Sequence, residues 1–431
     1  MDRRFFNLFD LTEEQAIKLL DTPQSQIDEA EDSRYIAAAH LVNFPSDRAI
    51  QALIRAIQNT DPCLENRIVR RKSVETLGRL RAKVALPIVQ SCLKDEDCYT
   101  VENAAWAIGE IGTQDPEILE DLTQVLNRPD QTYRVVIHTL ATLQHQPALE
   151  RIRKFAESEH GSTASAAIAA VYRLTGDDAQ MHRVVEFLQD SDRVTRRSAI
   201  QDLIDAKYYR AIPQISRCPE SIVFRLRAIR LLADVGVAEG AIAFEEIQPY
   251  LEQTLCDRPN TLELVHEYDR PPALSFLIRE LYDTDFGRCY LATQTLLEQF
   301  SQEAPEALLQ TYEEEAYIDY GAHYHVIKLL GWLKYAPAYA LLIENLFNSA
   351  PQFQKSRGAA AIALGELGDV RAIPDLKACL ETKIWDLKYA ALMALETLGD
   401  LSNHEILARD TDWLVAAKAA SAIKVDNSVP A

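Results

Sequence analysis

Glycine and strand-forming patterns are scarce in this sequence. It holds 14 glycines in 431 residues, and few segments alternate between apolar and polar residues. Such alternation marks a half-buried strand, so its scarcity favours an all-α protein. No run of apolar residues approaches the roughly 18 that a membrane-spanning helix needs, so we expect no membrane insertion. Residues 1–6 lack the apolar core of a signal peptide.

The cysteines and histidines lack the grouping that a disulfide framework or a metal site requires. There are seven cysteines, an odd number, with no C-x-x-C pair. Reduced thiols in a cytoplasmic protein are the simplest interpretation. His323 and His325 would point roughly 200° apart on a helix, so they cannot share one ion. We also find no phosphate-binding loop and no serine nucleophile elbow, and we predict no metal and no tightly bound cofactor.

Positive charge is in deficit. The chain has 45 Lys and Arg against 65 Asp and Glu, which gives a formal charge of 45 − 65 = −20. This balance argues against nucleic-acid binding and against adhesion to anionic membranes, because both need clustered positive charge. An anionic ligand would have to meet a local basic patch.

The sequence does contain a repeated helical phrase of two small apolar residues, then Leu or Ile, and often Gly. The last aliphatic residue recurs about every 32 residues, apart from one gap of 65 that spans two periods. A fixed period of this length predicts a solenoid, whose function lies on a long surface. The ten anchor residues are Leu77, Ile108, Leu140, Val171, Leu203, Leu232, Leu297, Leu330, Leu364 and Leu395.

Each period predicts two helices. Residues 99–111 form one predicted helix, Gly112 to Pro116 interrupt it, and residues 117–126 form the next. Glycine just after a helix and proline at the start of the following one obey the usual capping asymmetry. The unit resembles HEAT and armadillo repeats. We therefore predict an all-α solenoid, an α-α superhelix of about 10–12 such repeats.

The repeats are predicted to form one continuous solenoid with an irregular segment in its second half. Thr12 is the predicted N-cap of a first short helix. Four prolines and longer spacers interrupt the rhythm after residue 235. The predicted parts are a cap at 1–30, N-terminal repeats at 31–235, a bend with an atypical repeat at 236–285, C-terminal repeats at 286–424 and a frayed tail at 425–431.

Two faces of each first helix differ in sequence. Positions three and four before the anchor share its face and are mostly small or aliphatic, so we predict that they form the core. Positions six and two before the anchor follow no consensus; examples are Arg71/Glu75 and Tyr324/Lys328. This second face is a candidate binding groove, although a solvated helix face explains any single pair equally well. Arginines on these helices suit a carboxylate-bearing ligand.

The densest group of ionisable and aromatic residues spans 319–328. Asp319 is a candidate acid or base, with Tyr320 as a second proton donor. The alternative is an aspartate that caps a helix, surrounded by surface aromatic residues. Both interpretations place this group at the start of a first helix.

A second group spans 99–110 and continues one repeat later. Glu102, Asn103 and Trp106 share or border one helix face, and Tyr133-Arg134 with His138 extend the stripe. A tryptophan on such a face is a stacking platform for a planar ligand, and a structural tryptophan is an equally good interpretation.

Four segments together resemble a known family. They are residues 2–12, 66–72, 101–109 and 319–325. They resemble the E/F-type phycobilin lyases of cyanobacteria, in the branch directed at phycoerythrin, and the resemblance extends over nearly the whole chain. That branch contains both plain lyases and lyase-isomerases.

The resemblance implies an activity. Members bind a linear tetrapyrrole, usually phycoerythrobilin, as substrate and help a cysteine of a phycobiliprotein subunit add to it as a thioether. The implied partner here is a phycoerythrin α-type subunit, and some members convert the product to phycourobilin. Because the acceptor supplies the thiol, no cysteine of this chain is required.

We assign site roles as hypotheses on this basis. Asp319 contacts pyrrole nitrogens and exchanges protons, with Tyr320 and His323 as neighbouring donors. The predicted bilin-binding residues are Arg71, Glu102, Asn103, Trp106, Tyr133, Arg134, His138, Tyr324 and Lys328. Among these, Arg71, Arg134 and Lys328 are the predicted propionate ligands, and the aromatic residues form walls.

Other functions fit the same sequence. A helical-repeat scaffold without catalysis would bind no bilin and would tolerate changes at Asp319. A bilin-detaching or phycobilisome-disassembly factor would release bilin from a finished phycobiliprotein. A bilin carrier would bind the pigment without accelerating its attachment.

Overall fold

The computed structural model describes residues 11–23, 26 and 33–426. Within these ranges every regular element is a helix, so the predicted all-α solenoid class is confirmed. Residues 1–10, which carry part of the resemblance, and residues 427–431 of the predicted tail lie outside the described residues. Every helix of the described part is too short or too polar to cross a membrane. The chain divides into two compact units, Met1–Met181 and His182–Ala431.

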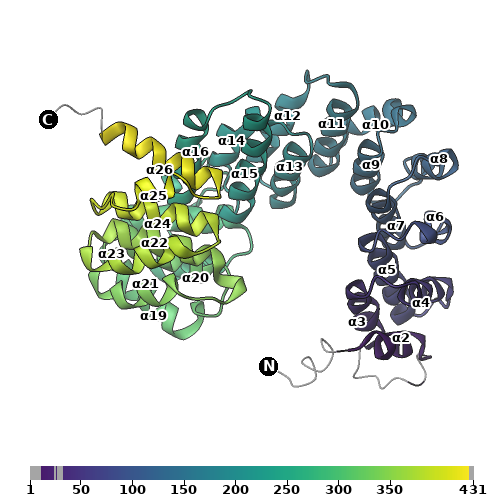
Figure 1. Cartoon of the computed structure of the whole chain (residues 1–431), viewed down its shortest axis with the longest axis horizontal. Helices are drawn as coiled ribbons and strands as arrows, with labels where there is room; N and C mark the ends of the chain where they lie inside the picture. Colours follow the sequence, from purple (N-terminus) through teal and green to yellow (C-terminus); the bar gives the residue numbers. More distant parts are fainter. Residues whose placement is uncertain (1–10, 24–25, 27–32, 427–431) are drawn as a thin grey trace. The chain divides into compact units, whose positions relative to one another are not determined.

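The first unit, Met1–Met181, has two layers of helices (Figure 1). Neighbouring first helices pack on one another in chain order. The first layer is α3 (Ser33–His40), α5 (Leu64–Arg79), α7 (Cys98–Ile111), α9 (Tyr133–Thr142) and α11 (Gly161–Thr175); the second is α4 (Asp47–Gln58), α6 (Leu86–Cys92), α8 (Pro116–Val125) and α10 (Leu149–Lys154), with α2 (Glu13–Asp21) packed on α3 and α4.

Local capping signals set the helix ends where the sequence predicts them. Thr12 caps α2 in a capping box with Gln15, as predicted. Asp97 caps α7 by accepting a hydrogen bond from the Thr100 amide, and α7 ends at Gly112, whose φ of 76° suits glycine. Pro116 occupies the first turn of α8. These signals produce the two-helix unit of each repeat.

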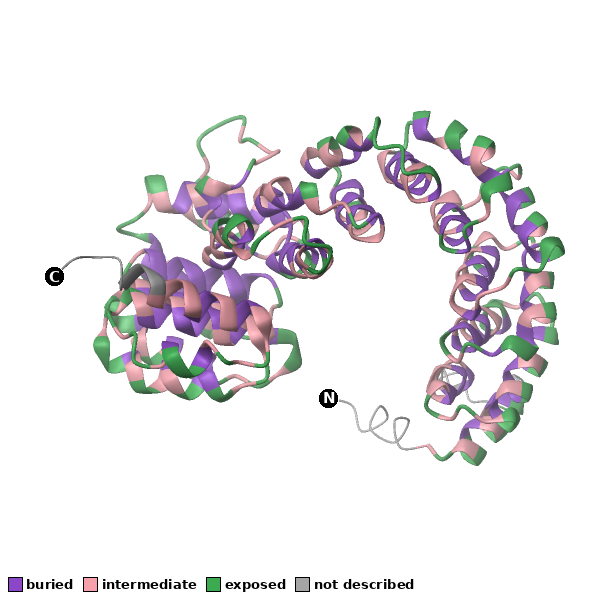
Figure 2. Ribbon diagram, turned by 45° about the horizontal axis from the view of Figure 1, so that its top comes forward, coloured by how far each residue is buried: buried purple, intermediate pink, exposed green. Residues whose placement is uncertain are grey.

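The predicted core column is buried. Eight of the ten predicted anchors are buried, and the exceptions are Val171 and Leu297. In the helix of Leu297, the neighbouring Leu296 is fully buried instead, so the pattern there is shifted by one residue. Close approach of adjacent helices requires small residues: a Cβ on Gly78 would lie 2.8 Å from Ala107 Cα. Figure 2 shows the buried residues of this unit gathered between its layers, with exposed residues on the second helices.

The second unit, His182–Ala431, contains further helix pairs. α20, α22 and α24 pack side by side. Its helices are α13 (Arg193–Asp205), α14 (Ile212–Arg217), α15 (Ile222–Ala238), α16 (Phe244–Cys256), α17 (Leu274–Glu280), α18 (Phe286–Gln299), α19 (Ala304–Thr311), α20 (Ala322–Trp332), α21 (Tyr339–Leu346), α22 (Gln354–Leu367), α23 (Ile373–Ala378), α24 (Trp385–Thr397), α25 (His404–Leu407) and α26 (Trp413–Asp426), while α12 (Met181–Glu186) spans the boundary.

The segment predicted as irregular, 236–285, holds α16, a 3-10 turn at Pro259–Thr261, a stretch without helix and then α17. α16 packs on α14, α15, α22 and α26. It ends at Asp257, whose φ of 50° lies in the left-handed region. The compact units divide at Met181, and the boundaries predicted at 30, 235 and 285 stay predictions.

Candidate functional site

A cavity of about 430 Å³ opens in the second unit. Helix α15 supplies one wall, and the N-terminal ends of α22 and α24 supply the other. Its apolar lining includes Ile222, Leu226 and Leu255, and Tyr320 and Trp385 add aromatic rings. Such a mainly apolar hollow with a few polar groups is the usual form of an organic ligand site.

Lys355, on α22, lines this cavity in an unusual state. The side chain is only 8% exposed, and its ammonium has no hydrogen-bond partner. Three rings surround it: Nζ lies 3.4 Å from the ring centroid of Tyr320, 4.6 Å from that of Phe286 and 5.0 Å from that of Tyr324. Burial, with the Lys328 ammonium nearby, lowers the pKa of Lys355 to about 7.

Beside Lys355 lies a fully buried ionic cluster centred on Asp257. Its carboxylate accepts hydrogen bonds from Arg225, from Lys328, from Tyr290 at 2.9 Å and from Tyr324 at 2.6 Å. Burial alone would raise the pKa of Asp257, but the Lys328 ammonium and the Arg225 guanidinium hold it well below its ordinary value. The cluster therefore joins α15, α18 and α20 to the end of α16.

This cluster corrects the expectation that Tyr324 and Lys328 lie on an open groove face. Both side chains are buried, because the end of α16 covers that face of α20 and Asp257 pairs with both of them. Lys328 therefore already has a carboxylate partner. A bilin propionate could reach it only by displacing Asp257.

Two arginines of α15 line the same cavity in different states. Arg230 is held by both carboxylate oxygens of Asp412 and by Asp234, and it stacks over Trp385. Arg227 is exposed, donates to Gln201 Oε1 at 2.9 Å, and pairs with no carboxylate within the described part of the chain. Arg227 is thus the cation of this cavity that is open to an external anion.

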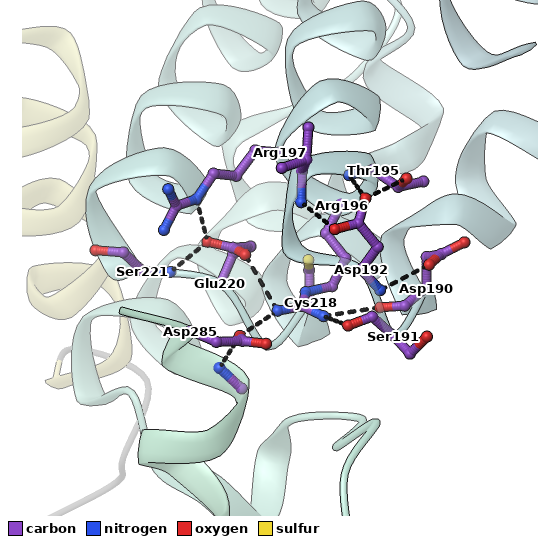
Figure 3. A network of polar contacts seen from close by, with 12 residues as sticks. Asp190, Ser191, Asp192, Thr195, Arg196, Arg197, Cys218, Glu220, Ser221 and Asp285 are labelled. Atoms are coloured by element: carbon purple, nitrogen blue, oxygen red, sulfur yellow. Dashed lines mark hydrogen bonds and ion pairs between the residues drawn. The ribbon is translucent and has the colours of Figure 1, made fainter. Parts of the chain in front are cut away.

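A second buried network fixes the start of α15 (Figure 3). Arg196 forms ion pairs with Asp285 and, at 3.3 Å, with Glu220, and it donates to the carbonyl of Asp190 at 2.8 Å. Glu220 also accepts from Arg197 at 3.0 Å. Because Glu220 directly precedes Ser221 and α15, the network holds the wall of the cavity in place.

Of the predicted catalytic residues, the structure places Tyr320 at the cavity, where it is 46% exposed. The neighbouring Asp319 accepts hydrogen bonds from the amides of Gly321 at 2.8 Å and Ala322 at 2.7 Å. Asp319 therefore fixes the turn that starts α20. This role resembles the alternative interpretation of Asp319 as a residue that caps a helix. Its proposed role in proton exchange stays a prediction.

The predicted catalytic residue His323 is fully buried and does not line the cavity. Its ring stacks on Phe353 at 3.9 Å, and Nδ1 lies 2.8 Å from the Ser356 hydroxyl. Burial and the nearby Lys355 ammonium lower the pKa of His323 to about 4. The ring is neutral at physiological pH and joins α20 to α22.

The other predicted residues lie in the first unit, on the adjacent helices α5, α7 and α9. Arg71 makes two hydrogen bonds to Asp97, at 2.6 and 2.7 Å, so this propionate candidate already has a carboxylate partner. Tyr133 donates to the Arg128 carbonyl at 2.6 Å, and Arg134 donates to the Ser162 carbonyl at 2.8 Å.

The remaining four residues of this stripe are half-buried. They are Glu102, Asn103 and Trp106 on α7 and His138 on α9. The structure thus brings the predicted first-unit residues together on one helix layer. Their roles toward a bilin stay predictions.

Two family models match parts of the chain. A model described as HEAT repeats matches residues 63–135, and one described as PBS lyase HEAT-like repeat matches residues 33–59 and 356–382. These matches confirm the HEAT character of the repeats.

Two curated relatives match nearly the whole chain. "Uncharacterized phycocyanin operon protein Y" of Pseudanabaena tenuis is 62% identical and is covered over 99% of its length, using 97% of this chain. "Bilin biosynthesis protein CpeY" of a Synechococcus strain is 32% identical, with 92% of this chain and 98% of the relative covered. The chain belongs to the HEAT-repeat bilin lyase family.

Among solved structures, the complex of CpcE and CpcF of phycocyanin lyase from a Nostoc strain aligns with 57% of this chain and 95% of its own. The identity is 25% and the TM-score 0.48. The resemblance to E/F-type phycobilin lyases is confirmed at the level of the family. Membership supports bilin attachment to phycobiliproteins, with the bilin as substrate.

The cavity residues of this bilin lyase homologue were largely absent from the predicted site. Lys355, Arg227, Trp385 and Asp386 line it, and none of them was selected. Tyr320, Lys355, Trp385 and Asp386 lie nine or ten positions before the anchors Leu330, Leu364 and Leu395. That column, at the N-terminal end of each first helix, is the signal that would have found them.

Proposed function

We propose that this protein is a lyase that binds phycoerythrobilin and attaches it by a thioether to a cysteine of a phycoerythrin α-type subunit. The observation that carries the proposal is the match over 92% of the chain to a relative named as bilin biosynthesis protein CpeY. Isomerisation to phycourobilin is an additional outcome to be scored in the same assay.

The cavity of the second unit has the chemistry that a bilin needs. The conjugated body of a bilin requires apolar and aromatic walls, which Leu226, Trp385 and Tyr320 offer. Its two propionates require cations, and Arg227 stands exposed at the cavity. Its pyrrole N–H groups require an acceptor. Asp386 is the acid that lines the cavity, and burial raises its pKa.

The thiols of this chain support a nucleophile from the partner. Burial raises the pKa of Cys218 to about 12 and that of Cys92 and Cys379 to about 11. The pKa of Cys289 also rises, again mainly through burial. Since the thiolate is the reactive form, these buried groups are poor nucleophiles at neutral pH. This burial supports an attacking sulfur from the acceptor subunit, as the family resemblance implies, while Cys63 and Cys98 are less buried than the thiols named above.

The proposed reaction is the addition of a thiol to a carbon–carbon double bond, and the chemical help that we assign to this protein is proton exchange. The S–H bond of the acceptor and the π bond of the ethylidene group break, the sulfur bonds to the ethylidene carbon of ring A, and a proton is added to the adjacent ring carbon. No oxidant or reductant enters. We propose that Asp319 and Tyr320 exchange these protons. As a separate proposal for the first unit, Glu102, Asn103, Trp106, Tyr133, Arg134 and His138 contact a bilin.

Co-production tests the proposal. The protein is made with a phycoerythrobilin-synthesising pathway and one acceptor subunit, and the purified subunit is denatured before its absorbance is read. A covalent band that depends on this protein supports a lyase, and its position distinguishes phycoerythrobilin from phycourobilin. Absence of any covalent band on every acceptor would contradict the proposal, and release of bilin from a finished subunit would favour the detaching alternative.

A phycocyanin subunit is the second candidate acceptor. The relative at 62% identity is named as a phycocyanin operon protein, and this name supports phycocyanin as the alternative acceptor. The assay is therefore run in parallel with phycoerythrin and phycocyanin α-type subunits. The ratio of the two covalent yields decides between them.

A further inference from the structure

The feature of the second unit that the family assignment leaves unexplained is the charge state around Lys355. The structure describes three buried lysines there, Lys328, Lys355 and Lys418. Lys328 pairs with Asp257, and Lys418 pairs with Glu252 at 2.9 Å and Glu396 at 2.6 Å. Among these three, only Lys355 has an ammonium without a carboxylate or a hydrogen-bond partner. Burying an unpaired charge is costly, so such a group calls for a functional explanation.

The acids nearest to Lys355 are already engaged. Asp257 is bound by Arg225, Lys328 and two tyrosines, and Asp319 accepts two backbone amides before α20. Counting Arg225 and Lys328 against Asp257 leaves one positive charge beside the cavity before Lys355 is added. Within the described part of the chain, Lys355 therefore has no carboxylate partner, and Asp386, the acid that lines the same cavity, forms no ion pair with it.

The three aromatic rings compensate for this only in part. Cation–π contacts with Tyr320, Phe286 and Tyr324 stabilise an ammonium, but they leave its N–H donors unsatisfied. Tyr320 supplies the nearest of these rings and is half-exposed, whereas Tyr324 is buried. Rotation of the Tyr320 side chain is thus the simplest way to open the ammonium to the cavity.

We propose that Lys355 binds a carboxylate of the ligand in this cavity, with the ring of Tyr320 as its movable cover. This rests on the proposed function. The apolar and aromatic lining favours an organic carboxylate over inorganic phosphate. One ammonium suits one carboxylate, and the exposed Arg227 is placed for a second, so the ligand class is a conjugated dicarboxylate such as a linear tetrapyrrole.

The proposal predicts that binding is coupled to a proton. The free ammonium loses its proton near pH 7, chiefly because of burial and next because of the Lys328 ammonium, while Cys289, Asp257 and Asp319 act in the opposite direction. A bound carboxylate would raise this pKa. Lys355 therefore takes up a proton when the dicarboxylate binds at pH 8, and the dicarboxylate binds more weakly at pH 8 than at pH 6.5.

The test uses two chemically defined probes, biliverdin and biliverdin dimethyl ester. The ester lacks both free carboxylates. Full-length protein and its Lys355→Met variant are titrated with each. Lys355→Met should weaken the binding of biliverdin about 10- to 100-fold at pH 6.5, the range of one charge-assisted hydrogen bond. The affinity for the dimethyl ester should stay unchanged. Lys154→Met, which removes an exposed lysine from α10, should change neither.

Calorimetry in buffers of different ionisation enthalpy gives a second readout. Proton uptake on biliverdin binding at pH 8 should occur in the unaltered protein and disappear in Lys355→Met. Tyr320→Ala should keep the preference for biliverdin over the ester. This variant lacks the ring that covers Lys355, but it retains the Lys355 ammonium.

An equal ratio of acid to ester affinity in the unaltered protein and in Lys355→Met would overturn the inference, and so would failure of the unaltered protein to bind biliverdin. Neither result decides the proposed function, which depends on covalent transfer of phycoerythrobilin in the co-production assay.

Discussion

The hydroxyl of Tyr324 donates a hydrogen bond of 2.6 Å to Asp257 Oδ2, and both groups are fully buried. The two residues are 67 positions apart in sequence, and the contact connects the irregular segment to a regular repeat helix. Within the described residues, Asp257 is thus the one carboxylate that pairs with both Arg225 and Lys328.

Replacing this anion should destabilise the second unit strongly. Asp257→Ala leaves Arg225 and Lys328 buried without a carboxylate, and removing one partner of a buried pair typically costs about 3–5 kcal/mol. Urea unfolding monitored by circular dichroism measures the change. Glu315→Ala is the matched control, since it breaks an exposed pair with Arg279 and should leave the unfolding midpoint unchanged. Equal effects of the two substitutions would contradict the role of the cluster.

The stability of the second unit should also be sensitive to one added methyl group between its packed helices. A Cβ on Gly331 would lie 2.6 Å from Ala363 Cα, so α20 and α22 would have to separate. We expect Gly331→Ala to cost about 1–3 kcal/mol of unfolding free energy, as overpacking does. Gly358→Ala is the control on α22, because its new Cβ would meet only Ala390 Cβ at 3.9 Å. That control should be stabilising by up to about 1 kcal/mol, since alanine favours a helix.

The period of the sequence predicted the layered fold well, because core positions repeat locally along each helix. It failed at the face of α20, where every residue from Ala322 to Trp332 is buried. The covering group, Asp257, lies in a segment with no repeat pattern and reaches Lys328 across 71 residues. No local pattern can encode such a pairing.

The cavity was missed for a related reason. The predicted groove used positions six and two before each anchor, which lie along the middle of a helix. Leu226 and Arg230, at these positions before Leu232, do line the cavity, but much of the remaining lining comes from the helix starts, including Lys355 and Trp385. These positions differ in residue type between repeats, so only their shared distance from the anchor relates them. Tyr320, a predicted site residue that does line the cavity, belongs to the dense group of ionisable and aromatic residues at 319–328.

The buried histidine His323 should make stability depend on pH. Its pKa is lowered from 6.5 to about 4 in the folded chain, chiefly by burial. Between pH 6.5 and about pH 4, His323 is protonated in the unfolded chain but not in the folded chain. The free energy of unfolding therefore falls as the pH decreases through this range. At 1.36 kcal/mol for each pKa unit, the loss between pH 7 and pH 5 is about 2 kcal/mol.

Urea unfolding at pH 7 and pH 5 checks this expectation. His323→Gln should be less stable at pH 7, because it loses the stack on Phe353, but it should lose less on acidification than the unaltered protein. His160→Gln, at an exposed position, should keep the full pH dependence. An unchanged acid loss in His323→Gln would assign the effect to other groups, with the buried His325 as the next candidate.

The proposed proton exchange at Asp319 can be separated from its structural role. The Asp319 carboxylate accepts the amides of Gly321 and Ala322 through one oxygen, Oδ1. An asparagine side-chain oxygen can accept the same two bonds, so Asp319→Asn should keep the turn and the unfolding midpoint. It cannot exchange a proton as a carboxylate does, and covalent transfer should fall at least about 100-fold, the lower end of the range for general acid–base catalysis.

The comparison with Asp319→Ala makes the result decisive. The alanine variant loses both amide acceptors, so it should be less stable by about 1 kcal/mol as well as less active. Bound bilin, read from its absorbance on the purified lyase, should persist in Asp319→Asn while the acceptor stays uncoloured. Full transfer by Asp319→Asn would contradict the proton-exchange role and would limit Asp319 to stabilising the turn before α20. The proton donor would then be another group at the cavity, with Tyr320 and Lys355 as the first candidates.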